Sequence, residues 1–302
     1  MFFWYNWKYE HNATWLARVV IIAVGCCLIH GKVVFASQQT IKDPVQKEKF
    51  VIYDATLVQG KPDLSAEGFH PINVLYVHSF WKDPHNRESL ESLPDEALVR
   101  RLARVAAAKG DLVVIDIEHW SLDGTDDNVQ KNLGKYAQII DWMHDERPDL
   151  KIGYFGIMPL ADYQGSRLPH GHVRYKQWQA KNDRLAQLAK RADIIFPYIY
   201  TYFEDVKAWR QFAVESINEA RRYGKPVYVF LMPHYSEKNV SRGGQYISDV
   251  FWRLQLETAR CYSDAAVVWT GPDEQWDPEL PWWRVTRSVL GDMDLMNRQG
   301  CD

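Results

Sequence analysis

The stretch that decides the fold is LVVIDIEHW, residues 112–120. It opens with four consecutive apolar residues, which is typical of a strand that is covered on both faces. Two acids, Asp116 and Glu118, stand at the carboxyl end of this run. Because successive side chains of a strand point to opposite faces, the two carboxyl groups share one face and lie ~6–7 Å apart along it. The stretch therefore predicts a buried strand that ends in a pair of neighbouring acids.

The remainder of the chain repeats this pattern. Six further apolar runs are rich in Val, Ile, Tyr and Phe, and segments with apolar residues at helical spacing separate most of them. This alternation predicts parallel βαβ units, and seven strands in 302 residues favour a closed barrel over an open sheet. We therefore expect an α/β fold, a distorted (β/α) TIM-type barrel with seven or eight parallel strands. The expected strands are residues 50–55, 72–80, 112–118, 151–159, 193–200, 226–233 and 265–271, and the expected helices are residues 94–110, 128–148, 174–192, 206–224 and 248–263.

The first 36 residues have the pattern of an export signal. A basic start with Lys8 and Arg18 precedes an apolar run of 11 residues, and Ala36 ends a plausible signal-peptidase site. The run is shorter than the ~20 residues of a transmembrane helix. We expect a signal peptide or an N-terminal membrane anchor over residues 1–36 and a single catalytic barrel over residues 37–302. The expected location is secreted or periplasmic, and membrane-anchored if the segment is not cleaved.

Charge and cysteine content restrict the class of function. The net charge is −3, and loss of the first 36 residues makes it more negative, so we expect no nucleic-acid partner. Export would leave Cys261 and Cys301, which could form one disulfide in an oxidising compartment. His170 and His172 stand two positions apart, and zinc would need a third ligand that the sequence does not offer nearby. We expect no metal, no cofactor and a monomeric protein.

The acids at residues 116 and 118 are candidates for a catalytic pair. Active sites of TIM barrels form at the carboxyl ends of the strands. Two close carboxyl groups resist joint ionisation, so one keeps its proton toward neutral pH, as a general acid must. The alternative is that each acid caps a backbone amide or pairs with an arginine.

Aromatic residues gather at the ends of the expected strands. Flat rings with a polar edge suit the binding of sugars, because they match the apolar face of a pyranose. The alternative for each of them is packing in a large core. The candidate substrate-binding residues are Trp120, Tyr154, Tyr198, Tyr200, Tyr235 and Trp269.

Five stretches of the chain resemble a known family. VVIDIEHW, GYFGIMP, PYIY, PVYVFLMPHY and VVWTG resemble, in this order, the strand motifs of the hyaluronidases, whose wider relatives are chitinase-type barrels with substrate-assisted catalysis. The resemblance runs from about residue 72 to residue 271. It implies a barrel that lacks one regular strand and a hydrolase that retains the anomeric configuration.

The resemblance also implies roles for individual residues. Glu118 matches the general acid/base, and Asp116 matches the carboxylate that holds the 2-acetamido group of the substrate while its carbonyl attacks the anomeric carbon. Tyr200 matches a tyrosine that hydrogen-bonds the acetamido group, Tyr235 a second tyrosine of the cleft, and Trp269 the aromatic floor below the sugar that is attacked.

The chain departs from the family in ways that leave the substrate open. Ile117 replaces a tryptophan between the acids, SLDG replaces an Arg-Pro pair, and two mature cysteines cannot form the disulfides of the family. We therefore expect an exported glycoside hydrolase that acts on a polysaccharide or oligosaccharide containing N-acetylhexosamine. The alternative is a non-catalytic carbohydrate-binding barrel of a polysaccharide-processing system.

Overall fold

The computed structural model describes residues 50–83 and 86–295. These residues belong to one compact unit, Glu48–Asp302. The predicted export segment, residues 1–36, and Cys301 lie outside the described residues. Cys261, near the end of a helix, is disulfide-bonded. Within the described part of the chain, none of the helices has both the length and the hydropathy that a membrane crossing requires.

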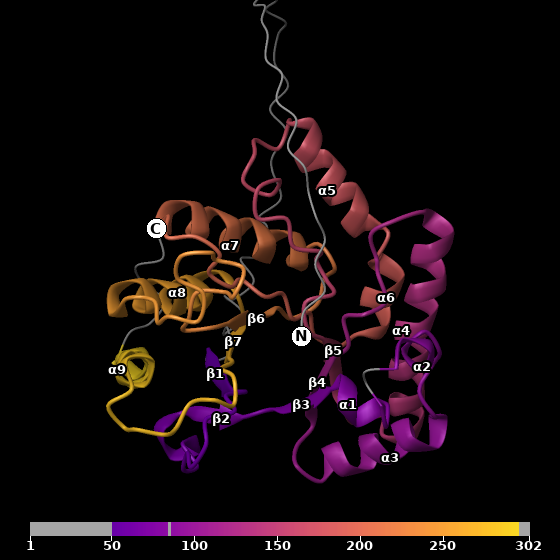
Figure 1. Ribbon diagram of the computed structural model, residues 1–302, viewed down its shortest axis with the longest axis horizontal. Helices are drawn as coiled ribbons and strands as arrows, with labels where there is room; N and C mark the ends of the chain where they lie inside the picture. The colour runs from indigo at the N-terminus through magenta and orange to yellow at the C-terminus, as the bar shows by residue number, and fades with distance from the viewer. Residues whose placement is uncertain (1–49, 84–85, 296–302) are drawn as a thin grey trace, which may run out of the picture. The chain divides into compact units, whose positions relative to one another are not determined.

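The strands form two parallel sheets that adjoin each other (Figure 1). One sheet has the order β2-β1-β7-β6 and the other the order β3-β4-β5. Isolated bridges join β5 to residues 195–198 and these residues to β6, and a single residue, Ile72, separates β2 from β3 along the chain. The strands are β1 (Val51–Asp54), β2 (Phe69–Pro71), β3 (Asn73–Tyr76), β4 (Leu112–Asp116), β5 (Lys151–Tyr154), β6 (Tyr228–Leu231) and β7 (Ala265–Val268).

This arrangement confirms the predicted α/β fold with parallel strands of the TIM-barrel type and modifies two of its strands. The predicted strand at residues 193–200 pairs only through isolated bridges, because Pro197 has no N–H to donate to a ladder. The carbonyl of Pro197 still accepts a hydrogen bond from the backbone N–H of Phe230, at 2.8 Å. The predicted strand at residues 72–80 is too long, because its strand part, β3, ends at Tyr76 and Val77–Phe80 form the short helix α1. A further short strand, β2, precedes β3 and pairs with β1, whereas β3 pairs with β4.

Helices follow most strands and cover the sheets from outside. Figure 1 shows α7, α8 and α9 beside β6, β7 and β1, and α3, α4 and α6 beside β3, β4 and β5. Asp95, Asp205 and Ser248 cap α3, α7 and α8 through their side chains. The helices are α1 (Val77–Phe80), α2 (Arg87–Leu90), α3 (Glu96–Ala107), α4 (Asp126–Glu146), α5 (Val173–Asp183), α6 (Ala186–Arg191), α7 (Val206–Arg221), α8 (Asp249–Tyr262) and α9 (Pro281–Leu295), with a 3-10 turn, η1, at Ser65–Glu67.

Two apolar clusters lie on the two faces of the strands. The inner cluster takes alternate residues from different strands, among them Val114, Phe230 and Val267. The outer cluster takes the residues between them, such as Val113 and Ile115, and packs them against the helices. Side chains that continue the inner alternation beyond the carboxyl ends of the strands therefore meet at one end of the barrel, and these side chains form the candidate site.

Candidate active site

Strand β4 brings both acids to the same end of the barrel. Asp116 is the last residue of β4 and shares its face with Val114 of the inner cluster. Glu118 continues this alternation two residues on, whereas Ile117 points the other way and is fully buried in the outer cluster. The two acids therefore share one face of the strand, as predicted, and this face is the inner one.

Neither carboxyl group is engaged by another group of the protein. In the described part of the chain, no hydrogen bond or ion pair involves the side chain of Asp116 or of Glu118, although many other acids pair with arginines, as Asp264 does with Arg221. The alternative, that the acids cap an amide or pair with an arginine, is therefore wrong. Unpaired carboxyl groups in such surroundings are uncommon in a role that is only structural.

The surroundings raise the pKa of both acids. Burial raises the pKa of Asp116 from 3.8 to about 6. Burial, followed by the charge of Asp116, raises the pKa of Glu118 from 4.5 to about 7, and the charge of Lys238 opposes this rise. Residue Glu118 is nevertheless exposed to solvent, so a ligand can reach it. Between pH 6 and 7, the pair favours an ionised Asp116 beside a protonated Glu118.

Three aromatic residues surround Asp116. Tyr76 is opposite Asp116 in the pairing of β3 with β4, and its hydroxyl accepts a hydrogen bond from Nε1 of Trp269 at 3.2 Å. Trp269 stacks on Tyr200, with ring centroids 6.4 Å apart and planes at 26°. The charge of Asp116 contributes to the raised pKa of both Tyr76 and Tyr200, after burial. The structure therefore brings the predicted residues Tyr200 and Trp269 together near Asp116.

Sequence reasoning missed Tyr76. The available signal was its place in the run INVLYV, where the alternation that buries Val74 inside the barrel also turns Tyr76 inward. Its polar edge then lies at the level of Asp116, because the two residues are paired across the strands.

A glycine lets the second acid approach its neighbour. Gly156 has φ +68, and a Cβ there would lie 2.7 Å from Cδ1 of Tyr198 and 3.2 Å from Oε1 of Glu118. The ring of Tyr198 and the carboxyl group of Glu118 therefore meet over the bare backbone of Gly156. Tyr198 also stacks on Phe155, with ring centroids 5.5 Å apart. The predicted residue Tyr198 thus lies at the site, and Gly156 is a further residue that sequence reasoning missed.

The charge of Lys238, on the loop after β6, also acts on Glu118 and lowers its pKa. The backbone N–H of Ser236 donates to the carbonyl of Thr201 at 2.8 Å, and Nδ2 of the buried Asn239 donates to the carbonyl of Tyr202 at 2.9 Å. These bonds fix the loop that carries Lys238, whose Nζ lies 5.9 Å from the ring centroid of Tyr202. Lys238 was not predicted, because a lysine in a polar loop is usually only solvated.

Two predicted substrate-binding residues belong to the core instead. Tyr154 is fully buried, and its hydroxyl donates to the carbonyl of Tyr136 at 2.8 Å, on the helix side of β5. Trp120 is 2% exposed, and its Nε1 donates to the carbonyl of Leu90 at 2.7 Å. The predictions for Tyr154 and Trp120 are therefore wrong, because both rings face the outer cluster and not the barrel interior.

Tyr235 is a third exception. It is 7% exposed, belongs to the outer cluster, and has the guanidinium of Arg242 5.8 Å from its ring centroid. The charges that affect its pKa, after burial, are those of Glu204 and Arg242 and not those of the two catalytic candidates. The structure therefore does not bring Tyr235 to the acids.

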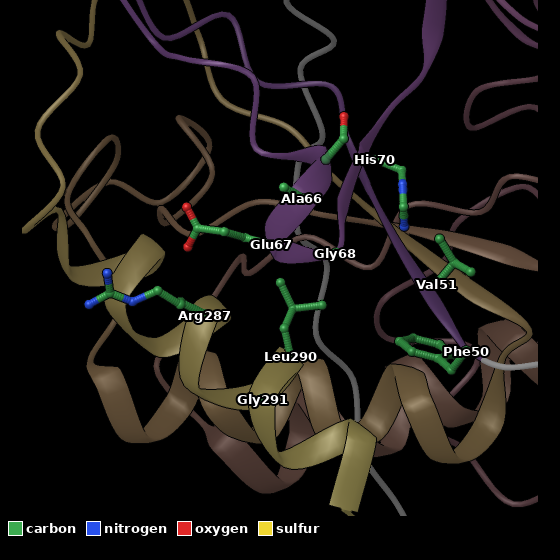
Figure 2. A pocket seen from close by; sticks show the side chains of 10 residues that line it. Phe50, Val51, Ala66, Glu67, Gly68, His70, Arg287, Leu290 and Gly291 are labelled. Atoms are coloured by element: carbon green, nitrogen blue, oxygen red, sulfur yellow. The ribbon is translucent and has the colours of Figure 1, made fainter.

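A hollow of about 420 Å³ lies at the other end of the strands (Figure 2). Phe50 and Val51 at the start of β1, His70 of β2, and Leu290 of α9 are among the residues that line it. Because the site of a TIM-type barrel lies at the carboxyl ends of its strands, this hollow is separate from the candidate site. Among residues 50–83 and 86–295, no three His, Cys, Asp or Glu side chains are grouped to hold a metal ion. His170 instead contacts Glu215 at 3.2 Å.

Comparison with known proteins identifies the fold. No family model and no curated protein matches the chain. Among solved structures, bee venom hyaluronidase in complex with a hyaluronic acid tetramer aligns with a TM-score of 0.51 and 13% identity, over 80% of this chain and 96% of that one. A glucosidase from Croceicoccus marinus aligns with a TM-score of 0.45 and 12% identity, over 76% of this chain and 50% of that one. An endo-1,4-beta-D-mannanase from Thermotoga petrophila gives 0.45 and 14%, over 74% and 75%. The first of these likenesses shows a fold of the TIM-barrel type.

Proposed function

We propose that the chain is a glycoside hydrolase that cleaves a polysaccharide containing N-acetylhexosamine, with Glu118 as the general acid and Asp116 as its ionised partner. One observation carries the proposal. Two neighbouring carboxyl groups, without a protein partner in the described residues, lie at the carboxyl end of a barrel strand with raised pKa values of about 6 and about 7. A fixed cationic partner would have kept both acids ionised, and neither could then have donated a proton at neutral pH.

The charges around Glu118 favour a substrate-assisted reaction. Among the described residues, the charged groups that shift its pKa are Asp116 and Lys238, so Asp116 is the one carboxylate that acts on Glu118 in this way. In the proposed reaction, Glu118 gives its proton to the glycosidic oxygen, the bond from the anomeric carbon to that oxygen breaks, and the acetamido oxygen of the sugar bonds to the anomeric carbon. Asp116 stabilises the positive charge on the acetamido nitrogen. Water then attacks the anomeric carbon and gives a proton to Glu118, while the bond from this carbon to the acetamido oxygen breaks and its electron pair restores the neutral acetamido group. The two inversions retain the configuration.

The aromatic residues around Asp116 support a sugar as the ligand. Trp269 and Tyr200 present stacked rings at the end of the barrel, and the indole N–H of Trp269 already donates to Tyr76. That bond fixes the indole plane and leaves its face for the apolar side of a pyranose. The hydroxyl proton of Tyr76 remains available for Asp116 or for the substrate.

We also propose that the protein is exported as a monomer with the carboxyl-terminal barrel as its catalytic part. The support for export is the pattern of the first 36 residues. N-terminal sequencing of the processed protein tests this proposal, and a start at Ser37 is expected only if the segment is cleaved after Ala36.

The test of the activity is release of reducing ends by the protein over residues 37–302. The panel contains chitooligosaccharides, hyaluronan, chondroitin, glycan strands of peptidoglycan and N-acetylgalactosamine polymers, each with and without chemical N-deacetylation. Hyaluronan is included because the bee venom hyaluronidase structure holds a hyaluronic acid tetramer. Cleavage of one N-acetylated polymer, with loss of cleavage after deacetylation and a product of retained configuration by NMR, is the expected result. Binding of a polymer without cleavage would favour the carbohydrate-binding barrel instead.

A further inference from the structure

The two acids have different neighbours, and the difference gives the site a direction. Asp116 lies beside Tyr76, whose hydroxyl is bonded to Trp269. Tyr200 lies between the two sides, because both acids contribute to its raised pKa and its ring centroid is 5.4 Å from that of Tyr198. Glu118 lies beside Gly156 and the ring of Tyr198. One side of the site is therefore built around the partner carboxylate, and the other side is built around the general acid.

An aromatic surface leads away from the side of the general acid. The side chains of Tyr198 and Tyr202 interact and shift each other's pKa, and Phe203 follows Tyr202 directly in the chain. Tyr163 supports both of the latter, with ring centroids 5.9 Å from Tyr202 and 5.0 Å from Phe203. Phe203 is 51% exposed. We name Tyr198, Tyr202 and Phe203 the aromatic track, since they run without interruption from Glu118 to the solvent.

The aromatic track is held in place before any ligand binds. Asn239 and Ser236 fix the backbone of Tyr202 and Thr201 through the hydrogen bonds described above. The guanidinium of Arg167 lies 4.5 Å from the ring centroid of Tyr163, on the side that supports the track. An exposed phenylalanine on so rigid a support binds a flat apolar surface without a large loss of conformational entropy.

The chemistry of the proposed reaction decides which part of a glycan the aromatic track would meet. A general acid protonates the oxygen that departs with the leaving sugar, so it lies at the boundary between the attacked sugar and the leaving one. Tyr198 and Glu118 both lie against Gly156, and Glu118 rather than Asp116 contributes to the raised pKa of Tyr198 and of Tyr202, so the aromatic track lies on the side of Glu118 and adjoins the leaving sugar. Resting on the function proposed above, we propose that the aromatic track binds the sugars on the leaving-group side of the cleaved bond.

This assignment makes the length of the leaving group important. A substrate with two or more sugars beyond the cleaved bond reaches Phe203, and a substrate with a single departing atom reaches none of the track. Stacking of one ring corresponds to about a three- to tenfold change in kcat/KM. The effect of losing Phe203 should therefore appear only with long leaving groups.

The experiment compares two substrates that share the same sugar at the attacked position. One is the hexasaccharide of the polymer that the activity panel identifies, and the other is the corresponding glycosyl fluoride, whose leaving group is one fluorine atom. Phe203→Ala is expected to lower kcat/KM for the hexasaccharide about three- to tenfold and to leave the rate on the fluoride unchanged. Phe203→Tyr should restore the hexasaccharide rate. Val105→Ala, at another exposed apolar residue (49% exposed) on α3, serves as the matched control.

The outcomes separate the two proposals. If wild-type protein cleaves no polymer, the proposed function fails and the aromatic track loses its assignment with it. If wild-type protein is active and Phe203→Ala changes both rates equally or neither rate, only the assignment of the track is overturned. An unchanged rate on both substrates would point to another protein, and not a glycan, as the occupant of the exposed ring.

Discussion

An asparagine at position 116 would keep the shape of the aspartate and remove its charge. Burial raises the pKa of Asp116 from 3.8 to about 6, so the folded protein holds this proton more tightly than the unfolded chain does. The protonated Asp116 therefore contributes to the stability of the folded protein, and this contribution is fully present below pH ~4. It is lost as the pH rises through about 6, where the folded protein must ionise a desolvated carboxyl group. Asp116→Asn avoids that ionisation and should therefore stabilise the protein at neutral and higher pH.

The raised pKa sets the size of the effect. Each pKa unit corresponds to ~1.4 kcal/mol, so the rise of Asp116 gives at most ~3 kcal/mol in the free energy of unfolding at pH 8. For a chain of this size, that difference corresponds to roughly 5–10 °C in Tm. At pH 4, the folded wild type is almost entirely neutral at this position and the unfolded chain is only about half ionised, so the gain should fall below ~1 kcal/mol.

The assay is thermal unfolding of residues 37–302 at pH 4 and at pH 8, for the wild type, for Asp116→Asn and for Asp273→Asn as an exposed control. Asp116→Asn should be more stable at pH 8, nearly equal at pH 4 and inactive at both. The reasoning is refuted if the variant is less stable than the wild type at pH 8, or if its stability differs from that of the wild type by the same amount at both pH values.

Three further substitutions test other parts of the site. Gly156→Ala places a Cβ 2.7 Å from the ring of Tyr198 and 3.2 Å from Glu118 at a φ of +68, so it should lower kcat/KM at least ~10-fold and destabilise the fold by ~1–3 kcal/mol in thermal unfolding. Lys238→Met removes a charge that lowers the pKa of Glu118; because the reaction needs Glu118 protonated, the alkaline limb of the pH–rate profile should move to higher pH. Tyr154→Phe loses one buried hydrogen bond and should cost ~1 kcal/mol of stability by chemical denaturation, with KM and kcat unchanged.

Each of these substitutions has a control in the same chain. Gly134→Ala, in α4 with open space around its Cα, should stabilise the protein by up to ~1 kcal/mol, and a similar result for Gly156→Ala would contradict the close approach at the site. Lys207→Met, at an exposed position of α7, should leave the pH–rate profile in place. Tyr200→Phe should lower kcat where Tyr154→Phe does not; equal effects of the two would mean that the inner and outer faces were assigned wrongly.

Continuous apolar runs located the strands because each strand is covered by the inner and the outer cluster at once. They did not predict how the strands pair where proline interrupts the ladder. Pro71 ends β2 and Pro197 reduces its segment to isolated bridges, and both effects depend on which N–H faces a neighbour. The run at residues 72–80 also did not show that the strand ends at Tyr76 and that residues 77–80 form a helical turn, α1.

The sequence predicted which side chains of a strand share a face only where polar residues marked that face. Asp116 and Glu118 had to share a face, and that face is the inner one. In KIGYF, two aromatic residues are adjacent, and nothing in the pattern says which of them turns inward. Pairing of Val114 with Gly153 decides it: Phe155 joins the inner cluster, and Tyr154 faces the helices.

Residues beyond the strand ends could not be placed by alternation. Trp120 follows β4 by four residues and turns to Leu90, while Tyr235 lies under the loop that Asn239 fixes. Lys238 reaches the site only through that same loop. Long-range hydrogen bonds determine these positions, and a single sequence does not reveal such bonds.

The most direct test of the central claim is the rate of reducing-end release by Glu118→Gln relative to the wild type, measured between pH 6 and 7 on the panel of N-acetylated polymers. Glu237→Gln, at an exposed acid of the loop after β6, is the control for loss of a carboxylate. The account predicts that the wild type and Glu237→Gln cleave the same polymer and that Glu118→Gln is slower by at least ~100-fold with an unchanged Tm or a higher one. Cleavage by Glu118→Gln at the wild-type rate would show that this acid is not the proton donor and would contradict the account.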